Sequence, residues 1–174
     1  MSFDWDLKWL VDFARTNAVW AAPIVLLISF CESIIFLSIL IPASVILIGF
    51  GALIAAGSLE LWPILLAATV GSALGDWAAY WLGHSMKGGV ARMWPIKNNP
   101  NLFHRGEAFV HRFGAMSIVI GRFIGPLRGV IPMVAGIFAM PQTGFQIANW
   151  CSAVLWAVVW LAPGFLVVKG WAMW

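Results

Sequence analysis

The chain has 174 residues, of which 62% are hydrophobic and only 10% are charged, and its formal net charge at neutral pH is +3. This composition excludes a soluble globular domain and is typical of a polytopic membrane protein. At roughly 20 residues for each membrane-embedded segment, the length allows one domain of about four to six segments and no soluble catalytic domain. The excess positive charge lies mostly in one loop, so we interpret it as a determinant of membrane orientation and not as a nucleic-acid-binding surface.

The chain begins with an acidic and aromatic stretch, residues 1–17, which differs from the basic start and short apolar core of a cleaved signal peptide. We expect this stretch to form an interfacial segment. Cys31 and Cys151 both lie in apolar runs. We therefore expect them to be small packing residues and not to form a disulfide.

The first apolar region, residues 18–60, is interrupted by an acid at Glu32 and by a proline at Pro42. Hydropathy alone allows two spans that separate at Pro42. We favour a helix followed by a re-entrant hairpin, because Pro42 lacks a backbone donor and the glycines that follow it favour bends. Non-helical backbone persists at membrane depth only where protein or a wet cavity satisfies it, so the sequence predicts a lined cavity near Glu32.

The next apolar stretch, residues 61–83, predicts a transmembrane helix with a tryptophan and a proline in its first turn. Gly71 and Gly75 are four residues apart, so they share one face and would let another helix approach closely. Asp76 lies inside this helix, one residue beyond that face. It is the second acid in an apolar region.

A polar loop follows at residues 84–113, in which five basic residues accompany a single acid, Glu107. By the positive-inside rule we predict that this loop is cytoplasmic. Its last part, residues 103–113, is predicted to form a short amphipathic helix on the membrane surface. The basic residues are Lys87, Arg92, Lys97, Arg105 and Arg112.

The second interrupted apolar segment, residues 114–141, carries two arginines, Arg122 and Arg128. A charge at the centre of a membrane helix costs roughly 2.5–3.5 kcal/mol on insertion scales, so each arginine indicates a functional site. On an unbroken helix, a separation of six residues would point the two side chains about 120° apart. A break at Gly125 and Pro126 would instead let both turn toward one site.

A final transmembrane helix is predicted at residues 142–168, so both halves consist of an interrupted apolar segment followed by a longer helix. Paired interrupted segments indicate a transporter binding site between inverted repeats. The sequence thus predicts a single all-α polytopic membrane domain with two inverted repeats, each a re-entrant hairpin followed by a transmembrane helix. The expected hairpin breaks are Pro42, Gly125, Pro126 and Pro132.

The run FVHRFGAMSIVIGRFIGPLRGVIPMVAGIFAM, followed by FQIANW, closely resembles the signature of the DedA family, relatives of the VTT-domain lipid scramblases. The resemblance extends upstream to Glu32, Asp76, Tyr80 and Gly83, and so covers nearly the whole chain. It implies a multi-pass bacterial inner-membrane protein with two opposed re-entrant hairpins. It also implies translocation of a lipid carrier, with undecaprenyl phosphate as the leading substrate, and often a dependence on the proton-motive force.

By position, the resemblance implies essential arginines at Arg122 and Arg128 and an essential membrane-embedded acid at Glu32. One position departs from the family pattern. Many members carry a second acid shortly after the proline of the first hairpin, where this chain has Ser44. This departure either removes proton coupling or shifts a larger share of it to Glu32 and Asp76.

Left unpaired, the four charges would cost on the order of 10–14 kcal/mol, so we expect them to pair. One interpretation is purely structural, with ion pairs that hold two hairpins in register. However, well-packed apolar residues often replace buried ion pairs without loss of stability, so four retained charges favour a use. We predict that Arg122 and Arg128 form a cradle for a phosphate monoester, and that Glu32 and Asp76 neutralise them until protonation frees them.

The leading function is therefore a carrier that returns undecaprenyl phosphate from the outer to the inner leaflet. The alternatives are a broad-specificity phospholipid scramblase, a proton-coupled exporter of small solutes, a membrane phosphatase and an assembly factor. Because the sequence has no nucleophile arrangement and its histidines lack metal-ligand spacing, we expect no enzyme activity, metal or cofactor. The expected partners are membrane lipids, and exposed hairpins are compatible with a homodimer. The histidines are His84, His104 and His111.

Overall fold

The computed structural model of the chain describes residues 16–33, 43–86, 100–124 and 128–171. This part of the chain is all-helical and contains no strand, which confirms the all-α part of the predicted fold class. The helices are α2 (Ala18–Ser33), α3 (Ala43–Ala55), α4 (Leu61–Met86), α5 (Pro100–Phe113), α6 (Met116–Gly121), α7 (Val130–Ile137) and α8 (Gln142–Trp171).

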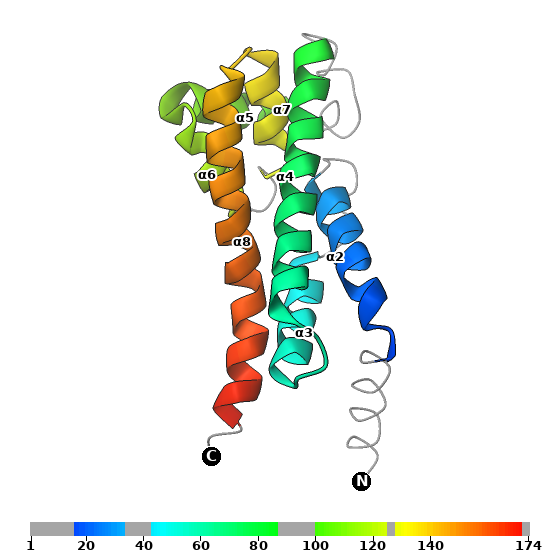
Figure 1. Cartoon of the computed structure of the whole chain (residues 1–174). Coiled ribbons are helices and arrows are strands. Elements are labelled where there is room, and N and C mark those ends of the chain that lie inside the picture. Colours follow the sequence, from blue (N-terminus) through cyan, green and yellow to red (C-terminus); the bar gives the residue numbers. More distant parts are fainter. Residues whose placement is uncertain (1–15, 34–42, 87–99, 125–127, 172–174) are drawn as a thin grey trace.

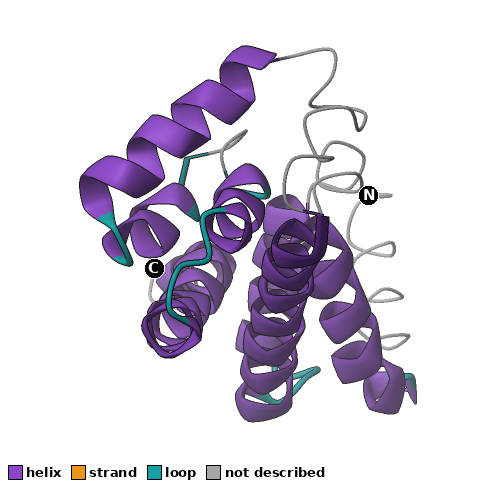
Figure 2. Cartoon of the chain, turned by 90° about the horizontal axis from the view of Figure 1, so that it is seen from above, coloured by secondary structure: helices purple, strands orange, loops and turns teal. Residues whose placement is uncertain are grey.

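Two long helices, α4 and α8, lie side by side and form the axis of the molecule (Figure 1). The helices α2 and α3 lie along the lower part of this axis in Figure 1, where α2 packs against α4 and α3 packs against α8. The helices α6 and α7 lie along the upper part, where α7 packs against α4 and α6 packs against α8. Figure 2 looks along the axis and shows α5 lying across this upper end of the bundle.

Within the described ranges, two helical stretches are long and apolar enough to cross a membrane, Leu61–Ser85 and Gln142–Gly170. They correspond to the two transmembrane helices that the sequence predicts. The helices themselves continue past the predicted ends, to Met86 in α4 and to Trp171 in α8, which runs through Pro163 without ending. The apolar helices α2 and α3 are shorter. Re-entrant hairpins and inverted repeats stay predictions at this point.

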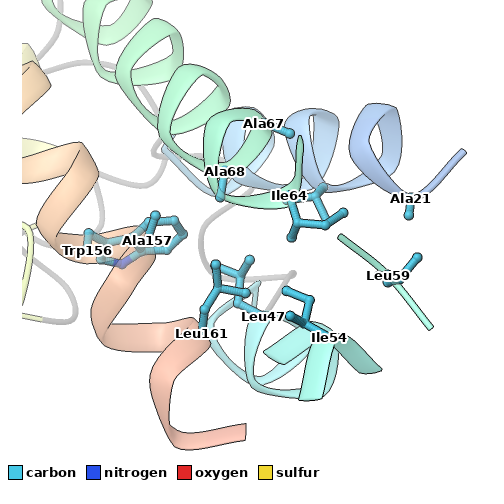
Figure 3. Packing of buried hydrophobic residues seen from close by; sticks show 11 residues of the cluster. Ala21, Leu47, Ile54, Leu59, Ile64, Ala67, Ala68, Trp156, Ala157 and Leu161 are labelled. Carbon is cyan, nitrogen blue, oxygen red and sulfur yellow. The ribbon is translucent and has the colours of Figure 1, made fainter. Parts of the chain in front are cut away.

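Four helices share one apolar core, which Figure 3 shows from close by. Leu47 of α3, Ile64 of α4 and Leu161 of α8 point toward one another in this core, and each is almost fully buried. The largest fully buried side chain, Trp156 of α8, belongs to the same cluster. A second core at the other end of the bundle is built around Tyr80, whose hydroxyl donates to the Met140 carbonyl oxygen at 2.6 Å.

Glycines permit the closest contacts between helices. Gly51 of α3 and Gly164 of α8 lie against each other's helix, and Gly83 of α4 and Gly136 of α7 do the same. A Cβ atom added at any of the four would overlap a backbone carbonyl oxygen of the partner helix. Each of the two crossings, α3 with α8 and α4 with α7, therefore depends on one glycine from each helix.

The helix α2 approaches α4 in the same way. Cβ atoms added at Gly71 and Gly75 would meet the carbonyl oxygens of Leu26 and Phe30, which belong to α2. This arrangement confirms the prediction that Gly71 and Gly75 form a face that another helix approaches closely. It also brings the end of α2 next to the middle of α4, where the charged residues lie.

Several sequence predictions fall outside the described residues. The interfacial segment lies mostly in residues 1–15, the first half of the basic loop lies in residues 87–99, and the hairpin breaks Pro42, Gly125 and Pro126 are also outside. Pro132 is described, and it lies buried in the first turn of α7, where a missing N–H leaves no helical hydrogen bond unmade. The helix predicted at 103–113 begins earlier, because α5 starts at Pro100.

Candidate functional site

The four charged residues of the apolar regions lie at the ends of short helices and in the middle of a long one. Glu32 is the second-last residue of α2, and Asp76 lies midway along α4. Arg122 directly follows α6, and Arg128 comes two residues before α7. All four residues are buried, with exposed fractions between 2% and 6%. The fold therefore places two acids and two arginines in its interior, and their side chains form two ion pairs.

Arg122 has three partners, all on the long helices. Its Nη2 forms an ion pair with Asp76 and donates to Asn149 Oδ1 at 2.6 Å. Its Nη1 donates to Ser72 Oγ at 2.6 Å. Asn149 is itself oriented by a 2.9 Å hydrogen bond from its Nδ2 to the Ala73 carbonyl oxygen. Arg122 thus connects the end of α6 to both α4 and α8 through short, charge-assisted bonds.

Arg128 is held differently, by one carboxylate and one aromatic face. Its Nη1 lies 2.6 Å from Glu32 Oε2. Its Nη2 lies 3.4 Å from the hydroxyl oxygens of both Ser33 and Ser72, which is long for a hydrogen bond. The central guanidinium carbon lies 4.1 Å from the centre of the Trp156 ring. This is cation–π geometry, and it leaves the nitrogen-bearing edge of Arg128 facing the polar residues.

Ser72 connects the two ion pairs. Its hydroxyl lies within hydrogen-bonding range of both arginines, at 2.6 Å from Arg122 and 3.4 Å from Arg128. Ser33 donates to the Ser72 carbonyl oxygen at 3.2 Å and so joins α2 to the same network. The two arginines, six positions apart in the sequence, therefore meet at one hydroxyl group. This is the convergence that the sequence predicts for a segment broken between them.

Ser44 stands beside the acid of the first segment. Its hydroxyl donates to Glu32 Oε1 at 3.3 Å, and its backbone N–H also donates to this carboxylate. Because Ser44 is the second residue of α3, the carboxylate of Glu32 lies at the positive end of that helix. At the position where the resemblance implies a second acid, this chain thus supplies Glu32 with a neutral donor.

Some polar atoms at this site have no hydrogen-bond partner among the described residues. They include Nε of Arg122, Nε of Arg128 and Oδ1 of Asp76, all of which are buried. An unpartnered buried donor costs about 1–3 kcal/mol, and more when it is charged. Such groups need an explanation in a native fold, and a bound polar ligand or water is one that fits.

The sequence reasoning missed four residues of this site: Ser33, Ser72, Asn149 and Trp156. Ser72 carried a usable signal, because it precedes Asp76 by four positions and therefore shares its helix face. Asn149 and Trp156 are seven positions apart, so they share a face of α8 two turns apart. An amide in a long apolar run was the signal for Asn149. The fully buried indole of Trp156 had none, since the chain has 12 tryptophans.

Other candidates stay apart from this cluster. Within the described residues, no group of three or more histidine, cysteine, aspartate or glutamate side chains could hold a metal ion. His104 lies on the exposed side of α5, with its Nδ1 3.5 Å from Glu107. The free cysteines Cys31 and Cys151 lie on different helices, α2 and α8.

Comparison with known proteins identifies the family. The model of the VTT domain matches residues 41–166. Inner membrane protein YabI of Escherichia coli K12 is 34% identical over 157 residues, which cover 90% of this chain and 62% of the relative. Uncharacterized membrane protein BU139 of Buchnera aphidicola is 31% identical over 159 residues, covering 91% and 62%. Inner membrane protein YqjA of Escherichia coli K12 is 29% identical over 151 residues, covering 84% and 67%.

The chain spans 62% of the length of the first two relatives. No solved structure matches it. The matched region of the VTT domain contains Ser44, Asp76 and both arginines, and the alignment with the relatives covers most of the chain. The chain therefore belongs to the VTT-domain, or DedA, family and is an inner-membrane protein.

Proposed function

We propose that the protein is a transporter that moves undecaprenyl phosphate, a phosphorylated lipid carrier, across the bacterial inner membrane. The observation that carries this proposal is the meeting of two buried arginines at Ser72, each with an unpartnered Nε. Guanidinium groups bind phosphate through paired N–H donors, and their charge does not depend on pH. A site of this kind inside an apolar bundle suits an anionic headgroup whose tail stays in the lipid.

Charge balance supports a coupling of transport to protons. The site holds two formal positive and two formal negative charges, so it is neutral when both acids are ionised. A phosphate monoester adds roughly −1.5 to −2 charges at neutral pH. Because excess charge is costly at low dielectric, binding of the headgroup favours uptake of a proton by Glu32 or Asp76. Loading and protonation would then occur together.

We further propose that α2–α4 and α6–α8 are inverted repeats. An exchange of α2 with α6, α3 with α7 and α4 with α8 converts the α2–α4 packing into the α6–α8 packing. The same exchange converts the α3–α8 packing into the α4–α7 packing. It also relates Gly51 and Gly164 at one crossing to Gly136 and Gly83 at the other. A single two-fold relation thus accounts for the contacts of six helices.

The position of the site fits two re-entrant hairpins. Glu32 and Ser44 lie at the facing ends of α2 and α3, and Arg122 and Arg128 lie at the facing ends of α6 and α7. The first repeat therefore brings its acid, and the second repeat its arginines, to the same interior site. A binding site between interrupted helices of two inverted repeats is the arrangement found in many secondary transporters.

The test is leaflet-resolved movement of undecaprenyl phosphate in proteoliposomes, with and without a pH gradient. We expect transport by the wild type that the gradient accelerates, and at least a tenfold loss in Arg122→Lys and Arg128→Lys, because lysine cannot reproduce the several N–H contacts that each guanidinium makes at this site. Arg105→Lys, on the exposed face of α5, is the matched control and should transport normally.

Other outcomes would identify the competing functions. Normal transport by both lysine variants would contradict the arginine cradle. Equal movement of any phospholipid, indifferent to the gradient, would support a scramblase. Release of inorganic phosphate from the lipid would support a phosphatase. Absence of transport by a folded wild-type protein would favour an assembly role.

A further inference from the structure

We infer that the two arginines have different tasks: Arg128 exchanges Glu32 for the phosphate monoester, whereas Arg122 keeps its pair with Asp76 throughout. Arg122 is then a positioning residue, and Arg128 is the residue that binds. The identity of the ligand rests on the proposed function, but the difference between the arginines rests on their contacts alone.

The contacts of Arg122 are those of a fixed group. Three acceptors surround its Nη atoms, and the two hydrogen bonds to the neutral partners Ser72 and Asn149 are both 2.6 Å long. All three acceptors lie inside long helices, far from any helix end. Moving Arg122 would break these bonds together and would also leave Asp76 buried without its cation. Its pair is therefore the harder of the two to open.

The contacts of Arg128 are those of an exchangeable group. A single carboxylate lies within 3 Å of it, and its two hydroxyl contacts are both at 3.4 Å. The central guanidinium carbon of Arg128 lies over the Trp156 ring, so the indole can hold Arg128 in place while its N–H groups change partner. Its Nε–H has no hydrogen-bond partner among the described residues and its Nη2 contacts are long, so these donors can turn to a doubly accepting phosphate.

Glu32 keeps a hydrogen-bond partner when the phosphate displaces it from Arg128. Its Oε1 accepts from the Ser44 hydroxyl at 3.3 Å, so the carboxyl group keeps one partner after the exchange. Asp76 has Ser33 as a neighbouring hydroxyl donor, but its Oδ1 has no hydrogen bond within the described part of the chain. The charged groups that interact with Glu32 are Arg128 and Arg122, both of the same cluster. The Glu32–Arg128 pair thus combines a weakly held arginine with a carboxyl group that has a second partner at the start of α3.

The test compares two matched variants, Glu32→Gln and Asp76→Asn. Each removes the charge of one carboxylate and leaves the arginine paired with it without an anionic partner. The purified full chain in nanodiscs is titrated with undecaprenyl phosphate, with the neutral alcohol undecaprenol and with inorganic phosphate. Binding is followed by native mass spectrometry and by the shift in melting temperature.

We expect Glu32→Gln to bind undecaprenyl phosphate at least tenfold more tightly than the wild type, because the competing carboxylate is gone. Asp76→Asn should show no gain in affinity and a lower melting temperature without ligand. Undecaprenol, which lacks the phosphate, should bind the wild type and both variants with equal affinity. Binding of inorganic phosphate with the same preference would show that the headgroup alone is recognised, which also supports the exchange at Arg128.

An equal gain in both variants, or a gain in Asp76→Asn alone, would overturn the division of tasks and leave the proposed function standing. Absence of lipid-phosphate binding by the folded wild type would overturn the proposed function. The different tasks of the two arginines can then still be tested without ligand, by nitrogen-15 NMR of the arginine side chains. We expect slower rotation and slower solvent exchange at Arg122 than at Arg128, and equal rates would contradict the inference even if a variant failed to fold.

Discussion

Trp156 makes two kinds of contact at the residue scale. One face of its indole lies 4.1 Å from the guanidinium of Arg128, and the rest of the ring packs in the apolar core beside Ala157 and Leu161. The indole therefore separates a charged cluster from an apolar one. It has the strongest cation–π interaction of the aromatic side chains, which fits its place under a buried cation.

Replacement of Trp156 tests this role. Trp156→Leu removes the aromatic face, so we expect binding of undecaprenyl phosphate to weaken by up to roughly 30-fold, since a desolvated cation–π contact is worth about 2 kcal/mol. Trp156→Phe keeps an aromatic face and should retain most of the affinity. Both variants shorten a core side chain and should lower the melting temperature, by a comparable amount. Equal affinities in the two variants would show that Trp156 acts only through packing.

Asn149 offers a second test at this scale. Its amide accepts from Arg122 and donates to the Ala73 carbonyl oxygen, and both bonds are buried. Asn149→Ala removes one buried hydrogen bond from each of the two partners, so we expect a loss of about 1–3 kcal/mol in the free energy of unfolding. Chemical denaturation of the wild type and the variant in detergent measures this difference in the free energy of unfolding. The control is Gln142→Ala at the exposed start of α8, which should change the stability little.

Sequence reasoning succeeded and failed at this site for physical reasons. The four charges stood out because charged residues are rare in apolar segments. Which acid pairs with which arginine depends on how helices distant in the sequence pack, and no local pattern encodes it. Asp76 and Arg122, for example, are 46 positions apart. The importance of Ser44 also became clear only when the fold placed it beside Glu32.

At the scale of the elements, the helix crossings determine the shape of the bundle. The crossing of α3 with α8 and that of α4 with α7 each use one glycine from each helix. The spans and their glycines are readable from the sequence, because hydropathy and small residues are local features. Which glycine meets which across a crossing cannot be read from the sequence, since it depends on which helices become neighbours.

Alanine substitution tests the crossings. Gly51→Ala should destabilise the protein by about 1–3 kcal/mol, because its Cβ would overlap the backbone of α8. Gly49→Ala is the matched control in the same helix. A Cβ at Gly49 meets nothing within 4 Å, so this variant should be neutral or up to about 1 kcal/mol more stable. Thermal unfolding of both variants in one detergent gives the comparison.

At the scale of the whole molecule, the start of α2 and the end of α8 lie at the end of the bundle opposite α5 (Figure 1). The basic residues concentrate in and before α5, with five of them in residues 84–113. The positive-inside rule then predicts α5 on the cytoplasmic side and the start of α2 on the outer side.

Cysteine labelling checks this orientation. In a background without the native cysteines, Val19→Cys on the exposed side of α2 should react with a membrane-impermeant maleimide added to spheroplasts. Ala108→Cys on the exposed side of α5 should react only after the membrane is permeabilised. The reverse pattern would place α5 outside and would contradict the orientation.

The pair between Glu32 and Arg128 joins the end of α2 to the segment before α7, and so connects the two halves of the molecule. On the proposed mechanism, this pair re-forms whenever the phosphate leaves. In the empty protein, this ion pair then holds the two halves together. They separate only when the phosphate replaces Glu32 at Arg128 or when a proton neutralises Glu32. Such a carrier does not leak ions between turnovers, which matters for a membrane whose proton gradient drives the rest of the cell.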